Sequence, residues 1–121
     1  MREILFRGKR LCNNKWMMGS LLCYEDGDCH ICCDNFGLNH YRVDPKTVGQ
    51  FIGLTDKNGK KIFEGDIMSE RGCLFVVVYD TKWARFKLQH IGRGIQYPEW
   101  NRGVQMEIVG NIHDNPELLE G

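Results

Sequence analysis

The chain is predicted to fold as a mainly β protein with antiparallel strands. Most of its fourteen glycines stand beside Asp, Asn, Glu or Arg, and β-rich segments separate these turn signals. Within several segments apolar and polar residues alternate, which is the pattern of a strand with one buried face. No window carries an apolar period of about 3.6 residues over three turns, so helix is expected to be a minor component.

Strands are expected in ten segments, each bounded by turn residues. They are residues 3–7, 15–23, 29–34, 41–44, 49–53, 61–63, 66–69, 74–79, 84–90 and 104–112. Asn58-Gly59 stands between two apolar segments and predicts a tight hairpin turn. Short helical turns are expected at residues 44–47 and 114–119, because Asp accepts hydrogen bonds from free amides and proline suits the first helical position.

Two of the expected strands have an informative order of apolar residues. In residues 104–112 one face would carry Val104, Met106, Ile108 and Ile112, and the other Gln105, Glu107 and Asn111. This is the pattern of a half-buried antiparallel strand. In residues 74–79 both faces are apolar, so that strand should be central and covered on both sides by the core or by another subunit.

The order of turns and strands also suggests an architecture. Residues 62–91 suit a small SH3-like barrel, although other short meanders would show the same order. The expected fold is a small antiparallel SH3-like barrel with additional antiparallel strands and a short C-terminal helical turn. A chain of 121 residues should form one domain, residues 1–121, or two abutting β lobes of about 1–50 and 51–121.

Charge and composition limit the class of protein. Sixteen basic and sixteen acidic residues cancel, so the chain as a whole lacks the field that attracts nucleic acid or an anionic membrane. The first residues carry a charge every few positions and no apolar run of signal-peptide length. The protein is therefore expected in the cytoplasm, without membrane contact.

The cysteines form the sharpest chemical hypothesis. They are Cys12, Cys23, Cys29, Cys32, Cys33 and Cys73, and in a reducing cytoplasm they should be free thiols or metal ligands. Residues 29–33 read Cys-His-Ile-Cys-Cys, and closely spaced thiolates can hold zinc. The two cysteines before this run have ten residues between them, and no glycine follows Cys32 to form a knuckle. A structural role, with Cys29, Ile31 and Cys33 on one buried strand face, is favoured over a metal site, which stays an open alternative.

The best candidate for nucleic-acid contact is the segment 82–87. If Phe86 and Leu88 face the core, the outer face carries Trp83, Arg85, Lys87 and Gln89. Cations there could meet phosphates while the indole stacks on a base. Alternatively, Trp83 packs at a strand end or lies in a subunit interface. The candidate contact residues are Lys82, Trp83, Arg85 and Lys87.

An enzyme is not expected. Glu64 and Asp66 could be considered as a catalytic acid and base, but they flank a glycine in an evident turn, where they should accept amide hydrogen bonds and stay solvated. The four histidines are scattered, and no glycine loop for phosphate stands between a strand and a long helix. No catalytic or cofactor-binding residue is therefore assigned, and no cofactor is expected.

Three segments resemble the YopX family of phage and prophage proteins. They are residues 2–10 with Trp16 and Gly19, residues 41–51 continuing into 53–67, and residues 107–112 with 115–119. The central segment reads Gly53-Leu-Thr-Asp-Lys-Asn-Gly-Lys-Lys-Ile-Phe-Glu-Gly-Asp-Ile67 and is long and specific in order. The resemblance implies a mainly β fold, a phage or prophage origin and a homo-oligomer, with no established activity. Residues 21–39 and 92–103 match no motif of that family, so an activity specific to this protein would reside there.

The leading hypothesis is an uncharacterised, non-enzymatic phage or prophage accessory protein in the cytoplasm of the bacterial host. It would act by protein–protein contact or by self-association through the apolar strand 74–79, with the identity of a protein partner open. One alternative is a nucleic-acid-binding β-barrel module that uses residues 82–87. Another is a zinc-binding regulatory domain that uses the group Cys12, Cys23, Cys29, Cys32 and Cys33.

Overall fold

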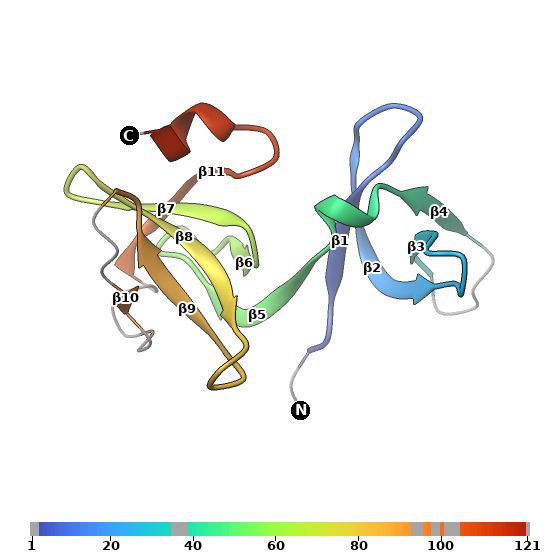
Figure 1. Cartoon of the computed structure of the whole chain (residues 1–121), viewed down its shortest axis with the longest axis horizontal. Coiled ribbons are helices and arrows are strands. Elements are labelled where there is room, and N and C mark those ends of the chain that lie inside the picture. The colour runs from blue at the N-terminus through green and yellow to red at the C-terminus, as the bar shows by residue number, and fades with distance from the viewer. Residues whose placement is uncertain (1–2, 35–38, 93–95, 98–99, 101–104, 121) are drawn as a thin grey trace. The chain divides into compact units, whose positions relative to one another are not determined.

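The computed structural model divides the chain into two compact units, Met1–Phe51 and Ile52–Gly121 (Figure 1). It describes residues 3–34, 39–92, 96–97, 100 and 105–120. All paired strands within these residues are antiparallel, so the predicted mainly β, antiparallel fold is confirmed. None of the described helices is long and apolar enough to cross a membrane.

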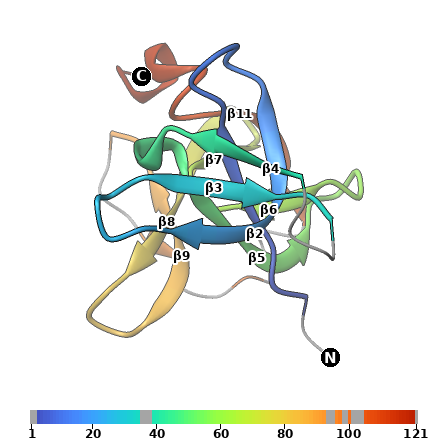
Figure 2. The same ribbon diagram turned by 90° about the vertical axis from the view of Figure 1, so that its right-hand side faces the viewer.

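The first unit is built from four strands, a single helical turn and the start of a fifth strand. These are β1 (Phe6–Lys9), β2 (Trp16–Cys23), β3 (Cys29–Cys32), β4 (His40–Val43), the 3-10 helix η1 (Pro45–Thr47) and β5 (Gly49–Thr55). Figure 2 shows β2, β3 and β4 side by side, in agreement with their pairing. Asp44 accepts a hydrogen bond from the Lys46 amide, which caps η1 as the sequence predicted.

Side chains that alternate along these strands form a small core. Its buried members are Cys29, Ile31 and Val43, and Phe6, Met17, Leu21 and Val48 pack against them. Glycine is required at position 19 of β2, because a Cβ atom there would meet the carbonyl oxygen of Cys32. The backbone of β2 and the carbonyl group of Cys32 therefore approach each other closely at Gly19.

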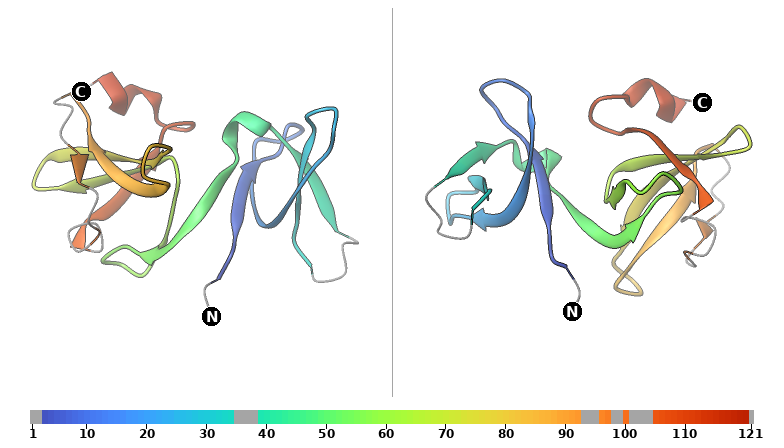
Figure 3. Two further views of the ribbon diagram at one scale, coloured as in Figure 1. Left: turned by 60° about the horizontal axis from the view of Figure 1, so that its bottom comes forward. Right: turned by 180° about the vertical axis from the view of Figure 1, so that it is seen from behind.

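The chain passes from the first unit to the second along β5, the green strand in both views of Figure 3. The strand order of the sheet that contains it is β4-β3-β2-β1-β5-β6. Between β5 and β6 (Lys61–Phe63) lies the predicted Asn58-Gly59 turn, with Gly59 at φ 83°. The carboxylate of Asp56 accepts hydrogen bonds from the amides of Asn58 and Lys60, both at 2.9 Å, and therefore fixes the turn.

The second unit contains a five-stranded sheet in the order β10-β9-β8-β7-β11. Its strands are β7 (Asp66–Glu70), β8 (Cys73–Asp80), β9 (Arg85–His90), β10 (Gln96–Tyr97) and β11 (Glu107–Asn111), and the 3-10 helix η3 (Pro116–Glu120) follows. The buried core consists of Ile62, Met68, Phe75, Val77, Leu88 and Met106. The register places Met68 opposite Phe75 and Val77 opposite Leu88, so these alternate residues of β7, β8 and β9 point into this core.

Strand β8 lies at the centre of this sheet, as the two-sided apolar pattern predicted. Phe75 and Val77 are buried on its core face. On its other face Leu74, Val76 and Val78 are half-buried within the chain. Coverage of that second face by another subunit remains a prediction.

The predicted parity of the last strand is wrong after Ile108. The register of β11 against β7 shifts between Ile108 and Gly110, which is a β-bulge at Val109. Asn111, expected to face outward, is buried, and its Oδ1 accepts hydrogen bonds from the amides of His113 and Asp114. The bulge thus turns this amide inward to shape the turn before η3. Val104, which the sequence assigned to the apolar face with Met106 and Ile108, lies outside the described residues.

The predicted small SH3-like barrel is not confirmed. Closure requires the first and last strands of a sheet to pair. Among the described residues, β10 and β11 are the two edges of the five-stranded sheet, and β6 belongs to the other sheet, where it pairs with β5. The strands of residues 62–91 are therefore divided between two sheets.

Candidate functional site

Trp83 lies in the turn between β8 and β9. The amide of Lys82 donates a hydrogen bond to Asp80 Oδ1 at 3.0 Å, and Ala84 has a left-handed φ of 54° that directs the chain back into β9. The indole is 63% exposed. Its ring centroid lies 5.6 Å from Lys82 Nζ and 5.9 Å from Arg85 Cζ, so two cations flank an accessible aromatic ring.

This arrangement differs from the strand face that the sequence predicted. Strand β9 begins at Arg85, and the left-handed backbone at Ala84 ends the strand alternation before Trp83. The structure therefore brings Lys82, Trp83 and Arg85 together in a turn, which we call the Trp83 cluster.

Lys87, the fourth candidate, has a different environment. Its Nζ lies 3.6 Å from Asp80 Oδ2, and the two side chains are only 14% and 11% exposed. The register explains the contact, because Val78 is opposite Lys87 and Asp80 is the diagonal neighbour on the same sheet face. The positive charge of Lys87 is largely offset by this carboxylate.

A second aromatic and cationic cluster, not predicted from the sequence, lies on β1 and β2. The register pairs Lys9 with Trp16 and Arg7 with Met18, so these four side chains share one sheet face. The Trp16 ring lies 4.8 Å from Arg7 Cζ and 5.9 Å from Lys9 Nζ. The alternation of Arg7 and Lys9 was a usable signal, but the strand predicted for residues 3–7 ended before Lys9.

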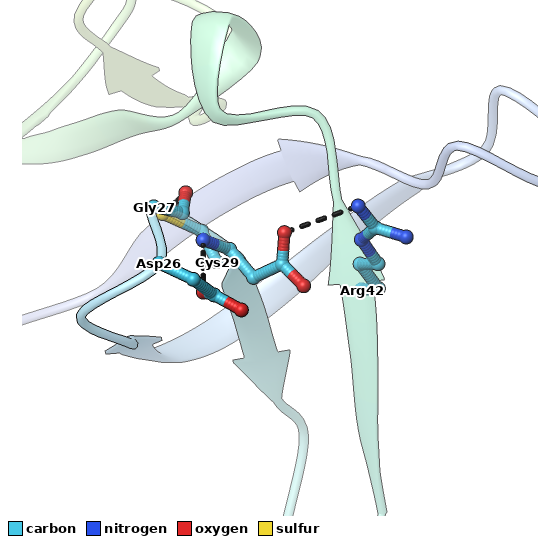
Figure 4. A network of polar contacts seen from close by, with 5 residues as sticks. Asp26, Gly27, Cys29 and Arg42 are labelled. Atoms are coloured by element: carbon cyan, nitrogen blue, oxygen red, sulfur yellow. Dashed lines mark hydrogen bonds and ion pairs between the residues drawn. The ribbon is translucent and has the colours of Figure 1, made fainter.

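The same face of the first sheet continues onto β3 and β4. His30 Nδ1 and His40 Nδ1 are 2.9 Å apart, and the Tyr24 ring meets the His30 ring edge-on at a centroid distance of 5.1 Å. Arg42 reaches across from β4 to the carboxylate of Asp28 at 3.0 Å, a contact drawn in Figure 4. Both partners of this ion pair are well exposed, so it contributes only slightly to the attachment of β4 to the turn between β2 and β3.

The cysteines do not gather into a single cluster. Cys23 Sγ and Cys29 Sγ are 2.9 Å apart, whereas Cys32 Sγ donates to the Asp34 carbonyl oxygen at 3.3 Å. Cys29 is buried with Ile31 as predicted, but Cys33 follows the end of β3 and is exposed. Within the described part of the chain, no group of three or more His, Cys, Asp or Glu side chains is arranged to hold a metal ion.

The hydrogen bond to Cys23, followed by burial, raises the pKa of the Cys29 thiol to about 11. Cys29 is therefore protonated at neutral pH. A thiol in this state is a poor first nucleophile.

The Glu64-Gly65-Asp66 turn differs from the expectation in one respect. Asp66 Oδ2 accepts a hydrogen bond from the Phe63 amide at 2.8 Å, as expected for a turn carboxylate. The side chain is only 2% exposed, however, so the prediction that Asp66 stays solvated is wrong. The chain reverses tightly at Gly65, with φ 93°, and this reversal folds the carboxylate inward over the turn.

These features define a small two-unit antiparallel β protein with aromatic and cationic clusters on its surface. The chain belongs to the YopX family, whose description is YopX protein and which matches residues 5–120. It is also similar to the crystal structure of protein EF1440 from Enterococcus faecalis, with a TM-score of 0.64 and 22% sequence identity. That likeness covers 98% of this chain and 99% of the other, and at this identity it shows the fold alone. No curated protein matches the sequence.

Proposed function

We propose that the protein is a non-enzymatic accessory protein of a phage or prophage that binds single-stranded nucleic acid in the host cytoplasm. The observation that carries this proposal is the Trp83 cluster, an indole 63% exposed with a cation near it on either side in sequence. Trp83 is among the most exposed large hydrophobic residues of the described chain, so its ring is accessible to a ligand. A base that stacks on the ring would cover it.

The chemistry of the cluster suits a nucleic-acid strand. Stacking of one base on an aromatic side chain contributes about 1–3 kcal/mol and tolerates any base. Lys82 and Arg85 would meet the phosphates on either side of the stacked nucleotide. Lys87 is left out of the contact, because Asp80 already offsets its charge. The Trp16 cluster, with Arg7 and Lys9, offers the same combination of groups in the first unit.

A titration tests the proposal directly. Fluorescence anisotropy of a labelled mixed-sequence single strand at low salt should show binding by the wild-type protein. Trp83→Ala should weaken it about tenfold, which corresponds to the loss of one stacked base. Two phosphate contacts predict that the logarithm of the binding constant falls with the logarithm of salt with a slope of about −1.4.

A matched charge control is available in another exposed turn. The double variant Lys82→Ala/Arg85→Ala and the double variant Lys57→Ala/Lys60→Ala remove the same charge, and all four side chains are exposed. Only the first should weaken binding strongly and lower the salt slope. Absence of binding by the wild-type protein, or equal losses in the two double variants, would refute the proposal.

Self-association is a second candidate function, favoured by one surface. Met18, Leu22 and Tyr24 are 53%, 41% and 49% exposed on one face of β2 and the turn after it, with Ser20 between the first two. A second copy of the chain that covers this apolar row would remove it from water. Sedimentation velocity should show a dimer that Met18→Ser/Leu22→Ser converts to monomer, with Leu119→Ser as the exposed apolar control. A wild-type monomer at high micromolar concentration would rule this function out.

A further inference from the structure

The two cysteines at the closed end of the β2–β3 hairpin lie in contact. They are directly opposite each other in the strand register, and their sulfur atoms are 2.9 Å apart. We propose that Cys23 and Cys29 form a reversible dithiol site, which acquires an intramolecular disulfide bond by exchange with a low-molecular-weight disulfide. This proposal is independent of nucleic-acid binding.

The backbone already has the geometry that such a bond requires. The Tyr24 amide donates to the Asp28 carbonyl oxygen at 2.8 Å, so Tyr24 and Asp28 occupy a hydrogen-bonding position of the ladder. Cys23 and Cys29 are the next pair along the ladder, one position further from the hairpin turn. They therefore form a non-hydrogen-bonded pair, in which the Cα atoms are about 4.5 Å apart. Disulfides span Cα separations of about 4.4–6.8 Å, so the strands would need little movement.

Different exposure gives the two sulfurs different roles. Cys23 is exposed, whereas Cys29 is 8% exposed and packs in the core cluster with Ile31 and Val43. An external disulfide can therefore reach Cys23 first. Cys29 is shielded from the reagent but lies beside the sulfur that the reagent modifies.

The exchange has two balanced steps. The Cys23 thiolate attacks one sulfur of the external disulfide, breaks its S–S bond and releases one small thiolate, which takes up the proton that Cys23 lost. The Cys29 thiolate then attacks Cys23 Sγ in the mixed disulfide and displaces the second small thiolate, which takes up the proton from Cys29. The protein loses two electrons and two protons, and the external disulfide is reduced to two thiols.

The first step also prepares the second. The largest cause of the high Cys29 pKa is the hydrogen bond to the Cys23 thiol, and the Coulomb effect of Cys23 acts in the same direction. Both causes disappear once Cys23 is in a mixed disulfide. Cys29 then ionises more readily, next to the sulfur it must attack.

The remaining cysteines lack such a neighbour. Cys32 donates to the Asp34 carbonyl oxygen, and β3 directs its side chain to the sheet face opposite to that of Cys29. Cys33 follows the end of β3 and is exposed, Cys12 lies in the turn after β1, and Cys73 lies on β8 in the second unit. The bond should therefore form between Cys23 and Cys29 in preference to every other described pair.

The test uses the full-length reduced protein with oxidised glutathione at mildly alkaline pH. The intact mass should fall by two hydrogen atoms, and six thiols minus two leaves four to titrate after denaturation. Trypsin alone cannot assign the bond, because one peptide between Lys15 and Arg42 holds four cysteines. Additional cleavage after Glu25 separates Cys23 from Cys29, Cys32 and Cys33, so the two fragments stay joined only through a disulfide, and the Cys29→Ser variant identifies its second sulfur. A reducing dithiol should restore six free thiols.

Four variants complete the experiment. Cys23→Ser and Cys29→Ser should lose the intramolecular bond, whereas Cys12→Ser and Cys32→Ser should keep it. Cys23→Ser should form no mixed disulfide at residue 23. It should fold normally, because the side chain is exposed. A wild-type protein that forms only a mixed disulfide, or a bond that survives Cys29→Ser, would overturn the proposal.

Discussion

Asp56→Asn should destabilise the second unit in a pH-dependent manner. Asp56 is 4% exposed and accepts three backbone hydrogen bonds, from Asn58 and Lys60 on Oδ1 and from Ile108 on Oδ2 at 3.0 Å. Burial alone would raise the pKa of this carboxyl, but the bonds from Ile108, Lys60 and Asn58, together with the charge of Lys60, outweigh it and lower the pKa. The ionised carboxylate therefore ties the β5–β6 turn to the start of β11.

The size of the effect follows from the bonds that asparagine keeps. Its carbonyl oxygen can still accept from the Asn58 and Lys60 amides, but its NH₂ group faces the Ile108 amide and cannot accept. The variant thus loses one hydrogen bond to a charged acceptor, and the free energy of unfolding at neutral pH should fall by about 2–3 kcal/mol. Ile108, 52 residues away in sequence, is the donor that becomes unsatisfied.

The pH dependence has a definite sign. A carboxyl with a lowered folded-state pKa contributes stability that is fully present above its unfolded value of about 3.9 and is lost as the pH falls through the folded pKa. The wild-type advantage over Asp56→Asn should therefore shrink as the pH is lowered from neutral to below about 3.9.

Urea unfolding at several pH values measures the difference in the free energy of unfolding between the wild-type protein and Asp56→Asn. Faster hydrogen exchange of the Ile108 amide in the variant would show that the loss arises at this hydrogen bond. Asp26→Asn is the matched control, since Asp26 also accepts one turn amide, that of Asp28 at 2.9 Å, but is exposed. The control should change stability by less than about 1 kcal/mol. A gap for Asp56→Asn that is the same at low and neutral pH, or no larger than that of the control, would refute the reasoning.

Three further substitutions test other contacts by urea unfolding. Gly19→Ala should cost about 1–3 kcal/mol, because the new Cβ meets the Cys32 carbonyl oxygen; an unchanged stability would contradict this close approach. Asp80→Asn keeps an acceptor for the Lys82 amide but leaves the charge of Lys87 without its carboxylate, so a loss of roughly 3 kcal/mol is expected; a loss within error would show that the ion pair is dispensable. Asn111→Ala should cost about 1–2 kcal/mol and speed amide exchange in the turn before η3, and unchanged exchange there would count against the role of Asn111.

Local turn chemistry explains why much of the fold was predictable. The backbone preferences and hydrogen bonds of Asn58-Gly59 and Asp44-Pro45 involve only residues close to them in sequence. Both segments form the predicted turns. The apolar run 74–79 needs no knowledge of its partners to be recognised as a central strand. The bulge at Val109 was not predictable in this way, because it depends on how β11 meets β7.

The contacts at the candidate sites likewise differ in whether they depend on sequence neighbours or on strand pairing. The cations beside Trp83 are its near neighbours in sequence, so their spacing was enough to group these residues, although the left-handed backbone at Ala84 puts them in a turn instead of on the predicted strand face. The ion pair of Lys87 with Asp80, the pairing of Lys9 with Trp16 and the contact of Cys23 with Cys29 all depend on strand register. Register is set by hairpin loop lengths and side-chain packing, which a residue pattern within one strand does not contain.

The interior of the first unit is notably small. Three described side chains form its buried cluster, against six in the cluster of the second unit. A fold of about fifty residues with so little hydrophobic stabilisation lies near the lower size limit for an independent domain. A covalent bond between the strands of its β2–β3 hairpin would thus change the rigidity of the whole N-terminal half. Removal of one methyl group from Ile31 would lower stability far more there than a similar loss elsewhere in the chain.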